Sequence, residues 1–169
     1  YVTGNLGDSY IGLKVLKKSI KMNKRLGNYF KKKYYYTDLN IKFIRKLLSL
    51  ANTSIDISDG LFTDLDKLIN KQKLSYKLYL KDVPISQNLK RLIDLKLIKK
   101  INCISKGDDY QILFTAKPSK SNIINRTGKT LGIKISKIGK ICSSSYTSEI
   151  IDEKKAKIIP KNKGYYHTF

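Results

Sequence analysis

The segment that most constrains the fold is residues 54–65, which reads Ser-Ile-Asp-Ile-Ser-Asp-Gly-Leu-Phe-Thr-Asp-Leu. Its first four residues alternate like a strand, and Gly60 then interrupts the pattern. Apolar residues return at helical spacing at Leu61, Leu65, Leu68 and Ile69. The segment therefore predicts a strand, a tight turn and a helix. Four of the chain's 13 acidic residues lie between Asp56 and Asp66.

Asp56, Ser58 and Asp59 are expected to crowd this turn. Two carboxylates and a hydroxyl at a helix start can bind a hard cation such as Mg²⁺, which completes its shell with water and phosphate oxygens. The alternative is that Ser58 or Asp59 simply caps the helix. Spacing alone leaves both interpretations open.

The run Asp-Ile-Ser-Asp-Gly-Leu at 56–61, followed by Asp64-Leu65, resembles the signature of the thiamine-monophosphate kinases. That family shares an ATP-dependent fold with aminoimidazole ribonucleotide synthetase. Four further segments match in the family's order, and together they extend the resemblance over nearly the whole chain. These segments are 2–9 (Val-Thr-Gly-Asn-Leu-Gly-Asp-Ser), 107–115 (Gly-Asp-Asp-Tyr-Gln-Ile-Leu-Phe-Thr), 138–141 (Ile-Gly-Lys-Ile) and 164–167 (Gly-Tyr-Tyr-His).

The resemblance implies an enzyme that transfers a phosphoryl group from ATP, its co-substrate, to thiamine monophosphate, giving thiamine diphosphate. It implies that Asp56 and Asp59 bind Mg²⁺ and that Ser58 contacts an ATP phosphate. It also implies that Asp108 and Tyr165 face the thiamine phosphate. Asp108 stands where the family usually has glutamate, and an Asx-type turn before a strand is the alternative interpretation. No catalytic acid, base or nucleophile is expected, and a lone His167 is interpreted as structural.

The implied fold class is α/β (α+β), similar to the aminoimidazole ribonucleotide synthetase C-terminal domain. That fold has a mostly antiparallel mixed sheet with helices packed on one face. Residues 1–169 are expected to form a single C-terminal domain. In the family, an N-terminal domain absent from this chain supplies further Mg²⁺-binding acids, part of the nucleotide site and the interface of a homodimer.

Elsewhere, hydrophobic periodicity predicts alternating elements. Residues 21–36, with Lys31–Lys33 and Tyr34–Tyr36, are interpreted as a solvated connector, with stacking on single-stranded bases as the alternative. The turn at Gly4 to Gly7 could approach a phosphate, but a plain turn is preferred. Predicted strands cover residues 1–3, 74–80, 110–115 and 133–141. Predicted helices have Ile11, Ile41 and Leu89 as their first apolar residues, and a further predicted helix begins at Pro118.

The formal net charge of +22 would ordinarily suggest a nucleic-acid or membrane partner. However, the 35 basic residues include only four arginines, the residue preferred for bidentate phosphate and base contacts. Nucleic acid is therefore an unlikely partner by composition. No run reaches the length of a membrane span, and a cytoplasmic location is expected. Cys103 and Cys142 lack metal-ligand spacing and are expected to be reduced thiols.

Two alternative functions remain at this stage. One is a related enzyme of the same superfamily with another substrate, which would differ around Asp108 and Tyr165. The other is an inactive fragment or a basic binding module, whose salt-dependent RNA binding would survive changes at Asp56 and Asp59.

Overall fold

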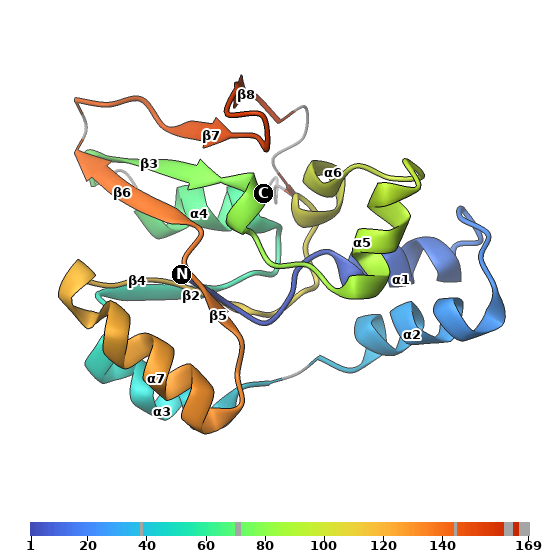
Figure 1. The fold of residues 1–169 in the computed structure, drawn as a ribbon, viewed down its shortest axis with the longest axis horizontal. Helices are drawn as coiled ribbons and strands as arrows, with labels where there is room; N and C mark the ends of the chain where they lie inside the picture. The colour runs from blue at the N-terminus through green and yellow to red at the C-terminus, as the bar shows by residue number, and fades with distance from the viewer. Residues whose placement is uncertain (38, 70–71, 144, 161–163, 166–169) are drawn as a thin grey trace, which may run out of the picture.

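The computed structural model describes residues 1–37, 39–69, 72–143, 145–160 and 164–165, which form two four-stranded β-sheets with helices around them (Figure 1). The first sheet has the order β2-β4-β1-β5, and all its neighbouring strands are antiparallel. Its strands are β1 (Val2–Thr3), β2 (Thr53–Asp56), β4 (Ile112–Thr115) and β5 (Ile135–Ser136).

The second sheet has the order β6-β3-β7-β8. Strands β3 and β7 are parallel, and the other pairs are antiparallel. The alternation predicted for 74–80 is confirmed at Tyr76 and Leu78, whose side chains are buried in β3. The strands are β3 (Leu74–Tyr79), β6 (Gly139–Ser143), β7 (Glu149–Ile151) and β8 (Lys157–Ile158).

The helix α4 (Leu61–Ile69), which follows the acidic turn, packs against both sheets. Leu61, Phe62, Leu65 and Leu68 point into a core shared with strands of the two sheets. Because this helix is fixed by the main core, the turn that precedes it is held in a defined position.

Two smaller cores hold the remaining helices, at different ends of the molecule (Figure 1). One joins α1, α2, α5 and α6, and the other packs α3 and α7 against the first sheet. No helix among the described residues is both long and apolar enough to cross a bilayer. The helices are α1 (Asp8–Leu16), α2 (Lys24–Tyr35), α3 (Ile41–Leu50), α5 (Gln87–Asp94), α6 (Lys100–Ile104) and α7 (Ser121–Leu131), with short 3₁₀ helices η1 (Leu80–Asp82) and η2 (Pro118–Lys120).

The predicted fold class is confirmed, with one refinement in how the strands are divided. The segment 133–141, predicted as one strand, forms β5 in the first sheet and β6 in the second. Between them, the carbonyl of Ile138 accepts a hydrogen bond from the Tyr79 N–H at 2.9 Å. The chain therefore crosses from one sheet to the other without a long loop.

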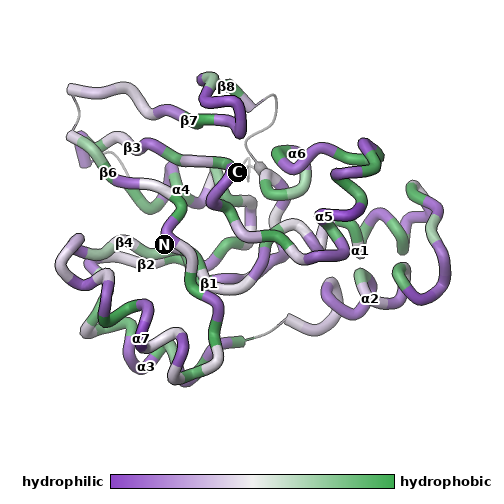
Figure 2. The backbone as a smooth tube through the Cα atoms, viewed as in Figure 1, coloured by the Kyte–Doolittle hydropathy of each residue, from purple (hydrophilic) through white to green (hydrophobic). Residues whose placement is uncertain are grey.

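The prediction of a solvated connector at 21–36 was wrong, because residues 24–35 form helix α2. Asn23 caps the helix by accepting a hydrogen bond from the Leu26 N–H at 2.9 Å. Phe30 is fully buried against α1, with Leu26 and Tyr29 beside it. In Figure 2 the helix is mostly hydrophilic with hydrophobic patches. The many lysines made the segment look solvent-exposed in the sequence and hid its short apolar face.

Both cysteines are free, in agreement with the predicted reduced thiols. Cys103 is buried beneath α1, and this burial raises the pKa of its thiol to about 12. A thiol with such a pKa stays protonated at neutral pH and is a poor nucleophile.

Candidate active site

The turn between β2 and α4 is shaped by its connection to β4. Asp56 is the last residue of β2 and is exposed to solvent. The next residue, Ile57, is fully buried and continues the strand pairing, donating its N–H to the Gln111 carbonyl at 2.9 Å and accepting from the Tyr110 N–H at 2.8 Å. The chain then turns at Ser58, Asp59 and Gly60, so the two predicted metal ligands lie on either side of a buried anchor.

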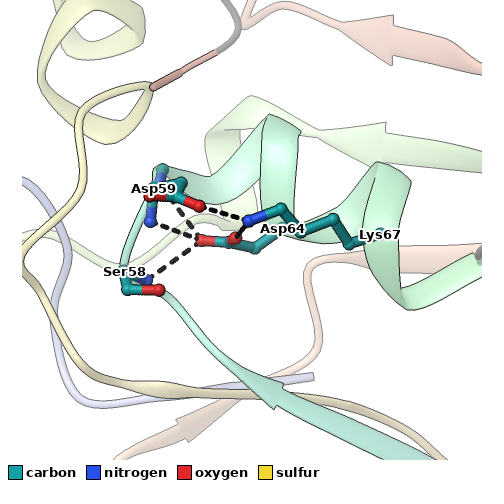
Figure 3. Close-up of polar contacts among 5 residues, drawn as sticks. Ser58, Asp59, Asp64 and Lys67 are labelled. Carbon is teal, nitrogen blue, oxygen red and sulfur yellow. Dashed lines mark hydrogen bonds and ion pairs between the residues drawn. The ribbon is translucent and has the colours of Figure 1, made fainter. Parts of the chain in front are cut away.

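Asp64 organises this turn from the first turn of α4 (Figure 3). Its Oδ2 accepts hydrogen bonds from the N–H groups of Ser58, Asp59 and Gly60 at 3.0, 2.9 and 3.1 Å. A carboxylate here satisfies donors at the helix start and interacts favourably with the helix dipole. Asp64 thereby fixes the backbone of the turn that precedes α4, and the capping role that the sequence allowed for Ser58 or Asp59 stays a prediction.

Lys67, one turn further along α4, joins the two acids of the turn (Figure 3). Its ammonium donates to Asp59 Oδ2 and, at 3.1 Å, to Asp64 Oδ1. The interaction with Asp59 is the main reason that the pKa of Lys67 is raised. The ammonium is therefore charged at neutral pH and offsets the charge of Asp59.

The start of the second predicted segment, residues 107–115, packs directly on this turn together with Ser105. The Asp108 N–H donates to the Ser58 carbonyl at 3.0 Å. A Cβ atom on Gly107 would lie 1.6 Å from the Ser58 carbonyl oxygen, and one on Gly60 would lie 2.3 Å from the Ser105 carbonyl oxygen. Glycine is required at both positions because the two backbones approach too closely for a side chain.

This packing places the Asp108 carboxyl near Asp59. Burial raises the pKa of Asp108, and the negative charge of Asp59 raises it further. The backbone of Asp108 has a φ of 66°, a left-handed conformation that aspartate tolerates better than most residues. Asp108 thus forms part of a turn and also presents a carboxyl beside the predicted metal ligands.

The third predicted segment reaches the same turn from the other end of the chain. The Tyr165 N–H donates to the Asp59 carbonyl at 2.9 Å, and Gly164 lies against Thr63. Tyr165 is 64% exposed. His167 lies outside the described residues.

Gln111 is buried and takes part in the fold. Its Oε1 accepts a hydrogen bond from the Thr3 hydroxyl at 2.8 Å. The Thr3 hydroxyl in turn accepts from the Ile112 N–H at 2.9 Å. These contacts link β1 to β4, so the Gln111 side chain holds strands together.

Asp109 was not assigned a role from the sequence, yet it fixes the glycine-rich turn before α1. Its Oδ2 accepts a hydrogen bond from the Gly7 N–H at 2.8 Å, so that donor is already bonded within the protein. Burial raises the pKa of Asp109 to about 8, and the nearby Asp8 adds to the shift, while hydrogen bonds from Gly7 and Ser9 oppose it. The pairing favours the plain turn over a phosphate site at residues 4–7.

We expect Asp109→Asn to remove a pH dependence of stability. The native carboxyl holds its proton up to a pKa of about 8, whereas the unfolded one ionises near 3.9. Since the native state binds more protons between these values, the native protein loses stability as pH rises. Relative to Asp109→Asn, it should lose up to about 1.4 kcal/mol for each pH unit between about pH 5 and pH 8. Urea denaturation of both proteins measures this, and parallel pH profiles would contradict it.

The described residues contain no group of three or more histidine, cysteine, aspartate or glutamate side chains placed to hold a metal ion. Asp56 and Asp59 nevertheless have the donor chemistry that Mg²⁺ prefers. Asp108 lies close enough to Asp59 for the charge of Asp59 to raise its pKa, so a third carboxyl is near the turn. The residues therefore fit a cation that takes only part of its ligands from this chain.

Comparisons with known proteins identify relatives for this arrangement. No protein-family model matches the chain. The chain is 35% identical to a thiamine-monophosphate kinase of Buchnera aphidicola subsp. Schizaphis graminum, over 99% of its own length and 51% of the relative. It is 28% identical to the thiamine-monophosphate kinase of Escherichia coli strain K12, over 83% of its length and 43% of that protein. The chain thus spans about half the length of the curated relatives it matches.

Solved structures share the fold. Thiamine-monophosphate kinase from Stenotrophomonas maltophilia K279a matches with a TM-score of 0.77 at 20% identity, over 90% of this chain and 48% of that one. AaThiL complexed with AMPPCP and TMP matches with a TM-score of 0.75 at 24% identity, over 98% and 50%. The hydrogenase maturation protein HypE of E. coli matches with a TM-score of 0.65 at 10% identity, over 96% and 51%. These likenesses confirm the aminoimidazole ribonucleotide synthetase-like fold.

Proposed function

This chain is a relative of the thiamine-monophosphate kinases over nearly its whole length, and we propose that it supplies half of a site that phosphorylates thiamine monophosphate from ATP. The observation that supports this most is the convergence of three separate segments on one turn. The backbone contacts of Ser58 with Asp108 and of Asp59 with Tyr165 join residues that are 50 and 106 positions apart in the sequence. This convergence supports the proposal that metal, nucleotide and substrate residues share one site.

Asp56 and Asp59 would hold Mg²⁺ in this proposal. Asp56 is exposed at the end of β2, and Asp59 lies within the hydrogen-bonded turn. When bound, the cation would offset negative charge on the transferring phosphoryl group. The role of the two carboxylates is to hold that charge beside the turn while Asp64 keeps the backbone in place.

Ser58, Asp108 and Tyr165 would orient the two phosphorylated ligands. Ser58 is half-buried beside the metal ligands and would contact an ATP phosphate. Asp108 and the exposed ring of Tyr165 would face the thiamine phosphate, whose cationic ring favours a carboxylate and an aromatic face. Phosphoryl transfer depends mainly on position and charge, so no side chain is assigned as a nucleophile.

The remaining half of the site would come from a domain like that in the relatives' other half. We propose that this domain adds further Mg²⁺-binding acids, nucleotide contacts and the interface of a homodimer. The proposed location is the cytoplasm, where ATP is available as co-substrate.

The metal role is tested by Asp56→Asn and Asp59→Asn. In the enzyme assembled with the complementary half, each change should weaken MgATP binding by at least about tenfold, because each removes a charged oxygen ligand. Calorimetric titration measures the affinity, and thermal unfolding verifies that the fold persists. Asp94→Asn, at the exposed end of α5, is the matched control. Unchanged MgATP affinity in both turn variants would rule out the metal role.

A further inference from the structure

Lys67 is placed where it can neutralise Asp59 and also move away. Only 12% of the Asp59 side chain is exposed, whereas 45% of the Lys67 side chain is exposed. The acid is therefore held in the turn, and the partly exposed Lys67 side chain extends from α4 to it (Figure 3). Of the two partners, the lysine is the one that can leave with little change to the fold.

The two carboxylate oxygens of Asp64 make different contacts, one with the backbone of the turn and one with Lys67. Its Oδ2 holds the three backbone N–H groups of Ser58, Asp59 and Gly60. Its Oδ1 is the second partner of Lys67, at 3.1 Å. If Lys67 left Asp59, the turn would keep its hydrogen bonds and the ammonium would keep one carboxylate partner. The exchange would thus break one ion pair and preserve the other.

We propose that the Lys67 ammonium acts as a tethered counter-ion at Asp59, which it releases when a divalent cation binds there. This inference rests on the proposed metal role of Asp59. A monovalent ammonium and a divalent cation compete for the same carboxylate, and close like charges repel. Lys67 therefore lowers the affinity for the cation and stabilises the turn when no cation is bound. It is a positioning residue, since it acts through Asp59.

The competition predicts that Lys67→Met binds divalent cations more tightly. Methionine keeps much of the side-chain length and removes the charge. We expect the affinity to rise about five- to tenfold, the range for losing one partly exposed, charged hydrogen bond. Lys67→Arg, which retains the competing charge, should remain close to the native affinity. Lys90→Met, on the exposed side of α5, controls for the loss of one positive charge.

The experiment titrates Mn²⁺ into the full 169-residue chain and follows free Mn²⁺ by electron paramagnetic resonance. Mn²⁺ is the probe because it shares the oxygen-ligand preference of Mg²⁺. Thermal unfolding with chelator and with saturating Mn²⁺ gives a second readout. Lys67→Met should unfold at a lower temperature than the native chain with chelator, and Mn²⁺ should remove that difference. A purely structural lysine would lower stability under both conditions.

Asp59→Asn separates the two claims. If this change abolishes Mn²⁺ binding while Lys67→Met leaves the affinity unchanged or weaker, the counter-ion inference is overturned and the metal role stands. If Asp59→Asn leaves Mn²⁺ binding unchanged, the metal role itself fails. If no variant of the isolated chain binds Mn²⁺, the same series is titrated in the complex with the complementary half, which supplies the remaining ligands, and absence of binding by every variant there contradicts both claims.

Discussion

Gly107→Ala is expected to destabilise the chain by at least about 3 kcal/mol and to separate the two segments that form the site. The added Cβ would lie 1.6 Å from the Ser58 carbonyl oxygen and 2.4 Å from its carbonyl carbon. Both are backbone atoms of the turn, so no rotamer change can relieve the clash. The Asp108 N–H would lose its bond to the Ser58 carbonyl as the loop moved away.

Urea denaturation measures this effect, with Gly27→Ala as the matched control. On α2, a Cβ at Gly27 would meet only ordinary contacts, at 3.5 Å from Val15 and 3.7 Å from Met22. Alanine there should be neutral or stabilise the helix by up to about 1 kcal/mol. Equal stability of Gly107→Ala and the native chain would show that the loop does not depend on this close approach.

Local patterns in the sequence were sufficient to predict the elements that form the site. The alternation before Gly60 and the helical spacing after it predicted β2, the turn and α4. The resemblance then assigned Asp59 to the metal and Asp108 and Tyr165 to the thiamine phosphate, which implies that the three residues lie near one another. Backbone hydrogen bonds at this turn confirm that proximity, while the ligands assigned to these residues stay predictions.

Other features could not be predicted because they depend on tertiary contacts. Helix α3 was predicted from Ile41, Ile44, Leu47 and Leu48. The structure buries Leu47 together with Phe43, which was not in that set, and leaves Leu48 93% exposed. Only the position of α7 and the first sheet decides which face of the helix is buried.

The roles of Asp64, Lys67 and Asp109 were missed for a similar reason. Asp64 was noted in the motif, but its bonds to three backbone N–H groups exist only once the turn has formed. The Asp109 side chain accepts a hydrogen bond from the Gly7 N–H, which is 102 residues away in the sequence. The adjacent acids Asp108 and Asp109 before a strand indicated a turn, but nothing in the sequence indicated the contact with Gly7.

The second large effect concerns activity. We expect the isolated chain to fold but to form thiamine diphosphate at least about a thousandfold more slowly than the assembled enzyme. The transferring phosphoryl group and ADP carry several negative charges, and Asp56 and Asp59 can anchor only part of the metal ions that offset them. Loss of a single charge-stabilising contact already costs about 10²–10³-fold in other enzymes.

Folding should not require the other half, because the chain has apolar cores of its own. The largest core packs α4 against both sheets. The apolar side chains of Ile57, Leu61 and Phe62 are fully buried in it. Cooperative urea unfolding of the isolated chain would verify this. The inactivity expected of the isolated chain can then be assigned to missing ligands for the phosphates.

The most direct test of the account measures thiamine diphosphate formed from ATP and thiamine monophosphate. The assay compares the chain alone, the chain mixed with the unmatched half of the Buchnera aphidicola relative, and the same mixture with Asp59→Asn, after gel filtration has shown that each mixture forms a complex. We predict product from the unmodified complex only. Turnover by the lone chain at the rate of the complex, or by the Asp59→Asn complex at the unmodified rate, would contradict the proposal that this chain supplies half of a metal-dependent kinase site.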